Sequence, residues 1–100
     1  MEVNAMTTDH ETLGHVSDLV RTELTGFLSD AFIIAEVTSE ILPGPDGDDY
    51  IRTIVIFEDD HPELDARALN KFSTHIDPLC KAKGFDRPTI AYANRSEIPA

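Results

Sequence analysis

Four acidic residues and one histidine crowd the segment 59–65, as Asp59, Asp60, His61, Glu63 and Asp65. Carboxylate oxygens together with an imidazole nitrogen could bind a divalent cation. The same acids are also typical of a helix N-terminus, where they accept hydrogen bonds from free backbone N–H groups and favour the helix dipole. Asp60-His61-Pro62-Glu63 adds an early proline to this pattern, so we expect a helix start here, with no metal ion and no cofactor.

A second acidic group, Asp46, Asp48 and Asp49, lies in the segment 43–49, which is rich in glycine and proline. Several carboxylates on a flexible loop could hold Ca²⁺ or Mg²⁺. The EF-hand pattern is not met, because the sixth position lacks glycine and the twelfth lacks glutamate. Aspartate and glycine are also ordinary turn residues. We therefore expect a turn between two strands.

Two further patterns approach catalytic motifs without matching them. His10 and His15 stand five residues apart, whereas the zinc-protease helix motif needs histidines four apart on one helix face. Cys80 is the only thiol, and a cysteine nucleophile needs a base in contact with it. Because Cys80 continues the apolar stripe that contains Ile76, we expect it to be buried. The sequence predicts no enzyme.

The elements that must position these residues follow from the apolar periodicity. Apolar steps of three and four predict helices, and alternation predicts strands. Pro78 predicts a kink or break near 75–77, and Gly84 predicts the end of that helix. Pro88 predicts an edge position for the last strand. The expected elements are a helix from a capping box at Thr8 to Leu28, strands 31–42 and 50–58, a kinked helix 60–84 and a strand 89–93.

This order, α-β-β-α-β, predicts an α+β fold, a two-layer sandwich with two helices on one face of a three-stranded sheet. The expected organisation is a tail over residues 1–7, one domain over 8–95 and a second tail over 96–100. In the first strand, alternation places Ile33, Ala35, Val37 and Ile41 on the buried face.

The second strand has apolar residues on both faces at its centre, where Ile54 and Ile56 lie beside Arg52. We expect Arg52 on the open face of the sheet, paired with Glu36 or Glu40. An alternative is a small-ligand or metal site around Arg52 and His61 on that open face.

The element order is similar to that of ribosome-binding factor A and other KH-like RNA-binding domains, whose helix before the last strand is broken. The closing run Arg87-Pro88-Thr89-Ile90-Ala91-Tyr92 also resembles that factor, although no Gly-x-x-Gly loop is present. The resemblance implies RNA binding through the basic residues of the second half: Lys71, Lys81, Lys83, Arg87 and Arg95. The stretch 45–54 resembles small bacterial proteins of unassigned function, which implies a bacterial origin and no particular activity.

The chain has 100 residues and a net charge of −11. This charge argues against nucleic acid or an anionic membrane as the first ligand, because both attract clustered Lys and Arg. One cysteine and no long apolar run predict a cytoplasmic protein without a membrane span. Residues 1–66 hold sixteen acids and two arginines, so this portion could attract a basic protein or the basic second half of another copy.

We therefore expect a non-catalytic protein that acts through protein–protein contacts, as a homodimer, an adaptor or an antitoxin-like inhibitor of a basic partner. The residues expected to attract that partner are Asp46, Asp48, Asp49, Asp59 and Asp60.

Overall fold

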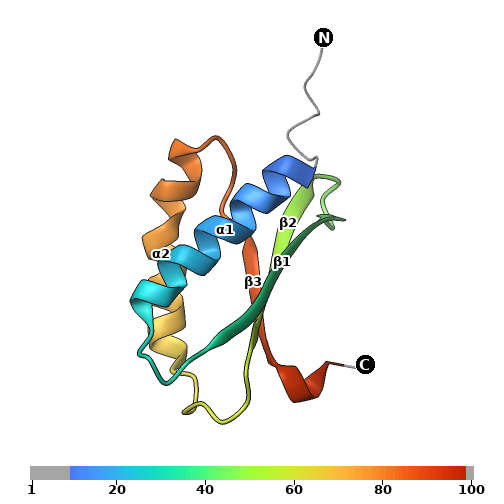
Figure 1. Cartoon of the computed structure of the whole chain (residues 1–100). Coiled ribbons are helices and arrows are strands. Elements are labelled where there is room, and N and C mark those ends of the chain that lie inside the picture. The colour runs from blue at the N-terminus through green and yellow to red at the C-terminus, as the bar shows by residue number, and fades with distance from the viewer. Residues whose placement is uncertain (1–9, 99–100) are drawn as a thin grey trace.

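The computed structural model describes residues 10–98 and has the expected α+β architecture (Figure 1). Two helices lie on one side of a three-stranded sheet, as predicted. The capping box at Thr8 and the tail 1–7 lie outside the described residues. The elements are α1 (His10–Phe27), β1 (Ile34–Pro43), β2 (Asp49–Phe57), α2 (Ala66–Ala82), β3 (Thr89–Asn94) and the short 3-10 helix η2 (Arg95–Glu97). Within the described residues, no helix is both long enough and apolar enough to cross a bilayer.

The sheet has the order β1-β2-β3, so β2 is the central strand. β1 and β2 form an antiparallel hairpin, whereas β2 and β3 are parallel and are joined by α2. β3 therefore lies at an edge, as Pro88 predicts. The edge position leaves the backbone groups on the outer side of β3 without a strand partner in residues 10–98.

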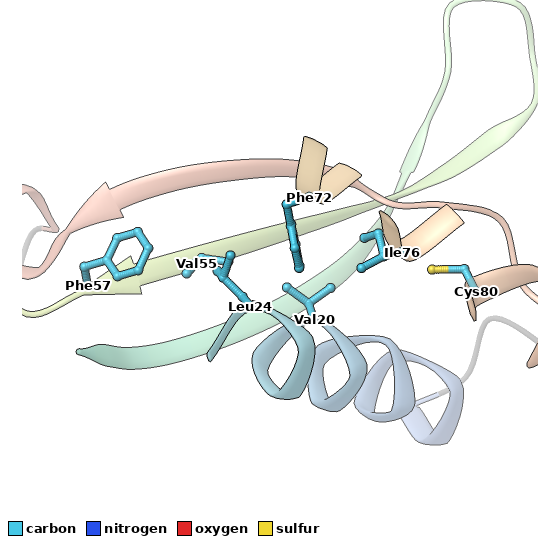
Figure 2. Packing of buried hydrophobic residues seen from close by; sticks show 7 residues of the cluster. All are labelled: Val20, Leu24, Val55, Phe57, Phe72, Ile76 and Cys80. Atoms are coloured by element: carbon cyan, nitrogen blue, oxygen red, sulfur yellow. The ribbon is translucent and has the colours of Figure 1, made fainter. Parts of the chain in front are cut away.

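The core lies between the sheet and the two helices (Figure 2). β2 contributes Val55 and Phe57, whose side chains are fully buried. Phe72 of α2 also packs edge-to-face on Phe27 of α1, with the ring centroids 5.5 Å apart. Cys80 is fully buried, as predicted. The buried cluster comprises Val20, Leu24, Val55, Phe57, Phe72, Ile76 and Cys80.

The start of β1 differs from the expected alternation. Ile33 is 61 % exposed, while Ile34 packs against the core. The register shifts between Ile34 and Glu36, because Ile34 pairs with Phe57 and Glu36 with Ile56. The extra residue is Ala35, and such a bulge reverses which side chains face inward. The prediction that Ile33 is buried is therefore wrong, whereas Val37 faces the core as expected.

The second helix begins later than the acidic segment predicts. α2 starts at Ala66, with the Asp65 carboxylate accepting a hydrogen bond of 3.0 Å from the backbone N–H of Arg67. Asp60 has a φ of 69°, a left-handed conformation that cannot begin a helix. The expected start at Asp60 is therefore wrong. The segment 58–65 is instead a loop, in which Asp65 caps the helix and Asp59 accepts a hydrogen bond from the backbone N–H of Ser96.

Pro78 lies inside α2, which continues without a break to Ala82. A proline removes one helical hydrogen bond, but buried Ile76 and Cys80 on either side hold this part of the helix against the core. The helix ends just before Gly84, whose φ of 92° suits glycine. The predicted end is confirmed.

Candidate interaction surface

One face of the sheet is not covered by either helix. Val55 and Phe57 of β2 point into the core, so the alternating residues of the same strand point away from it. In β3, Ile90 and Tyr92 contact the core, which places Ala91 and Ala93 on the opposite side. We call this surface the outer face, and its residues are Glu36, Thr38, Glu40, Arg52, Ile54, Ile56, Ala91 and Ala93.

The centre of the outer face is apolar. Ile54 lies opposite Ala91 in the register, and Ile56 lies opposite Ala93. All four side chains are half-buried, although no element packs over them within residues 10–98. On the same face, the exposed Thr38 of the neighbouring strand β1 pairs with Ile54. The result is a narrow apolar strip along β2 and β3, with polar residues along β1.

The charges of the outer face lie mainly on β1. Glu36 and Glu40 are exposed, and Glu40 lies directly opposite Arg52 in the hairpin register. Arg52 nevertheless forms no ion pair with any residue between 10 and 98. The predicted cross-strand position of Arg52 opposite Glu40 is confirmed, but no ion pair joins the two side chains. Being opposite in register sets only the backbone spacing, and these long side chains remain available to a partner.

At the end of this face, Arg95 binds Glu58 through two hydrogen bonds. The guanidinium donates from Nε at 2.9 Å and from Nη2 at 3.1 Å. This contact raises the pKa of Arg95, and the charges of Glu36 and Asp59 act in the same direction. Two parallel hydrogen bonds fix the planar guanidinium, so Arg95 is already engaged within the chain.

The two acidic groups lie at opposite ends of β2 (Figure 1). The nine residues of that strand span about 26 Å at the usual rise. Asp46 accepts a hydrogen bond of 3.3 Å from the backbone N–H of Asp48 and so supports the turn. Asp59 accepts one of 3.2 Å from Ser96, at the start of the segment expected as a tail. The five acids therefore flank the sheet from both ends and do not form one patch.

The five basic residues of the RNA alternative are also dispersed. Lys81 pairs with Asp77 at 3.2 Å on α2, and Arg95 pairs with Glu58. Lys71 lies earlier on α2, and Lys83 lines a groove beside α1. Arg87 and Lys81 do share one open pocket of about 400 Å³, together with Asp49, Tyr50 and Phe85. The described residues thus bring no more than part of this set together.

His61 does not form the site expected with Arg52. Its ring lies 5.3 Å from the ring centroids of both Phe32 and Phe57, and Phe57 is on the core side of the sheet. Arg52 is on the other side. Both nitrogens of the imidazole already have partners, the carbonyl oxygen of Pro62 and the side-chain oxygen of Asn94. Among the described residues, no three His, Cys, Asp or Glu side chains are placed to hold a metal ion.

Comparison with models of protein families, with curated proteins and with solved structures found no match. The resemblance to ribosome-binding factor A and to small bacterial proteins therefore stays a prediction. One element of the KH-like resemblance is not reproduced, because the helix expected to be broken is continuous from Ala66 to Ala82. The chemistry of the outer face is the remaining guide to function.

Proposed function

We propose that this chain is a non-catalytic binding module that holds a basic protein partner, in the manner of an adaptor or an antitoxin-like inhibitor. The outer face carries this proposal. Parallel strands such as β2 and β3 are normally covered on both faces. Here Ile54, Ile56, Ala91 and Ala93 have no covering element among the described residues. An apolar strip of this kind is a suitable docking surface for another protein.

The charge supports a basic partner. The chain has a net charge of −11, and acidic groups stand at both ends of the strands that form the outer face. Such a field attracts a cationic partner over a distance of about 10 Å at moderate ionic strength. Its main effect would be on the rate of association and on the choice of partner.

RNA binding through Lys71, Lys81, Lys83, Arg87 and Arg95 is the alternative. It draws support from the closeness of Lys81 and Arg87 around one pocket. The ion pairs of Lys81 and Arg95 weaken it, because RNA would have to compete with Asp77 and Glu58 for these cations. The net charge of −11 also repels RNA during its approach.

The test is purification of the tagged chain from its host at about 0.05 M and at about 0.5 M salt, which differ several-fold in screening length. Protein and nucleic acid are both measured in the eluate. We expect a stoichiometric basic protein that is retained at low salt and lost at high salt. RNA in its place, or the chain alone at both salt concentrations, would overturn the proposal.

A further inference from the structure

Resting on the proposed function, we infer that the segment bound at the outer face is an amphipathic helix of the partner, apolar on one side and rich in lysine or arginine along one flank. Within residues 10–98, the helices lie on one side of the sheet only. A helix on the other side would complete a three-layer arrangement, which is how sheets containing parallel strands are usually buried.

The spacing and size of the side chains on the outer face suit a bound helix. Ile54 and Ile56 stand about 7 Å apart along β2, and the parallel neighbours Ala91 and Ala93 lie about 5 Å to one side. The alanine side chains of β3 are shorter than the neighbouring isoleucine side chains of β2. An α-helix about 10 Å wide covers two adjacent strands and can place a stripe of apolar residues against both.

The charges of β1 indicate which residues the flank of the bound helix carries and how they are spaced. Glu36 and Glu40 are both exposed and lie about 13 Å apart along the strand. Basic residues separated by seven or eight positions on a helix are about 11–12 Å apart and face the same side. A helix lying along β2 and β3 would therefore present two lysines or arginines to Glu36 and Glu40.

A second copy of the chain fits this face less well. It would bring another Glu36 and Glu40, and among residues 10–98 of each copy Arg52 is the outer-face cation without an ion pair, because Arg95 already binds Glu58. Each copy also carries a net charge of −11. An added strand is disfavoured at β1, where the bulge at Ala35 interrupts the edge and Pro43 ends it.

The first experiment uses a synthetic Lys/Leu peptide designed as an amphipathic helix, with a scrambled peptide of the same composition as its control. Both are titrated into the ¹⁵N-labelled full chain. We expect the amphipathic peptide to bind at least tenfold more tightly and to shift the amide signals of 36–40, 52–56 and 91–93. Equal affinities, or shifts confined to 46–49 and 59–60, would overturn the inference.

The second experiment uses paired variants against the same peptide and against the captured partner. The double variant Ile54→Ser with Ile56→Ser removes the apolar strip. The double variant Glu36→Lys with Glu40→Lys reverses the charge that β1 presents to the flank of the bound helix. Asp18→Lys with Glu63→Lys changes the net charge by the same amount at exposed positions away from the outer face. We expect at least a tenfold loss of affinity for each outer-face pair and a much smaller loss for the control pair.

Circular dichroism checks that each variant is folded. If the isoleucine double variant unfolds, the glutamate double variant still tests the inference, because Glu36 and Glu40 are exposed. Equal losses in the glutamate and control pairs would overturn the inference. So would a dimer, seen by sedimentation, that the isoleucine pair abolishes. If the outer-face variants still capture the salt-sensitive basic partner, the helix proposal fails and the proposed function stands. If the unaltered chain captures no basic protein, the proposed function itself fails.

Discussion

The Nε2 atom of His61 lies 2.5 Å from the side-chain oxygen of Asn94, which ties the loop after β2 to the end of β3. The other ring nitrogen, Nδ1, lies 2.7 Å from the carbonyl oxygen of Pro62. Both neighbours are acceptors, so the imidazolium form can donate to both, whereas a neutral ring can donate to one. The contact therefore favours the protonated form of His61.

This geometry predicts a pH-dependent stability. The hydrogen bond to Asn94, followed by the one to Pro62, raises the pKa of His61 above 6.5, and the charges of Asp59 and Glu97 contribute. A raised pKa in the folded state stabilises the fold fully below pH 6.5, and this stabilisation is lost as the pH rises through the raised pKa. We expect Asn94→Ala to lower the pKa of His61 in an NMR titration and to weaken the pH dependence of urea unfolding. An unchanged pKa would contradict the assignment.

A chain of three hydroxyl groups links α1 to the centre of the sheet. Ser17 and Ser39 are 2.8 Å apart, as are Ser39 and Thr53, and Thr53 is fully buried. Ser39→Ala would leave the Thr53 hydroxyl without this partner, at a cost of about 1–3 kcal/mol in the free energy of unfolding. Adding Thr53→Val should recover part of that loss, because the stranded hydroxyl is removed. Urea unfolding of both single variants and the double variant measures this, and strictly additive losses would argue against the coupling.

Two glycines should respond to alanine in opposite directions. Gly84 has a φ of 92°, so Gly84→Ala should destabilise the fold by about 1–2 kcal/mol. Gly14 lies inside α1, where an added Cβ meets no atom within 4 Å. Gly14→Ala should therefore stabilise the fold by about 0.5–1 kcal/mol. Thermal unfolding of the two variants under the same conditions tests both signs.

The Cys80 thiol should be unreactive in the native protein. It is fully buried, and burial raises its pKa, with the charge of Asp77 acting in the same direction. Because the thiolate is the reactive form, alkylation by iodoacetamide should be slow without denaturant and fast in about 6 M urea, above the usual unfolding range. Rapid labelling of the native chain would show that this part of α2 opens readily.

The order and type of the elements could be predicted because each buried stripe has its own period. The apolar spacing of α1 and the alternation of β1 from Glu36 to Ile41 both depend on which side meets the core. The residue at which α2 starts could not be predicted, because an acidic residue followed closely by proline occurs both at helix starts and in loops. Here the left-handed Asp60 and the contacts of His61 with Phe32 and Phe57 keep the segment out of the helix.

The outer face had a partial signal in the sequence. Ile54 and Ile56 make β2 apolar on both sides, which predicts burial but does not say that the covering layer is missing. The bulge at Ala35 left no signal, because the alternation around Ile33 and Ile34 fits either register. The separation of Asp46 from Asp59 was implied by the strand expected over 50–58, which lies between the two acidic groups.

The parallel pairing of β2 with β3 has a consequence for biosynthesis. Residues 58–88 separate the two strands, and a ribosome needs roughly 2–6 s to add that many residues. During this interval β2 has β1 on one edge only, while Val55 and Phe57 have not yet met α2. A nascent chain with an apolar strand open on one edge is prone to pair with a neighbouring chain. The yield of folded protein should therefore depend on how quickly translation passes through α2.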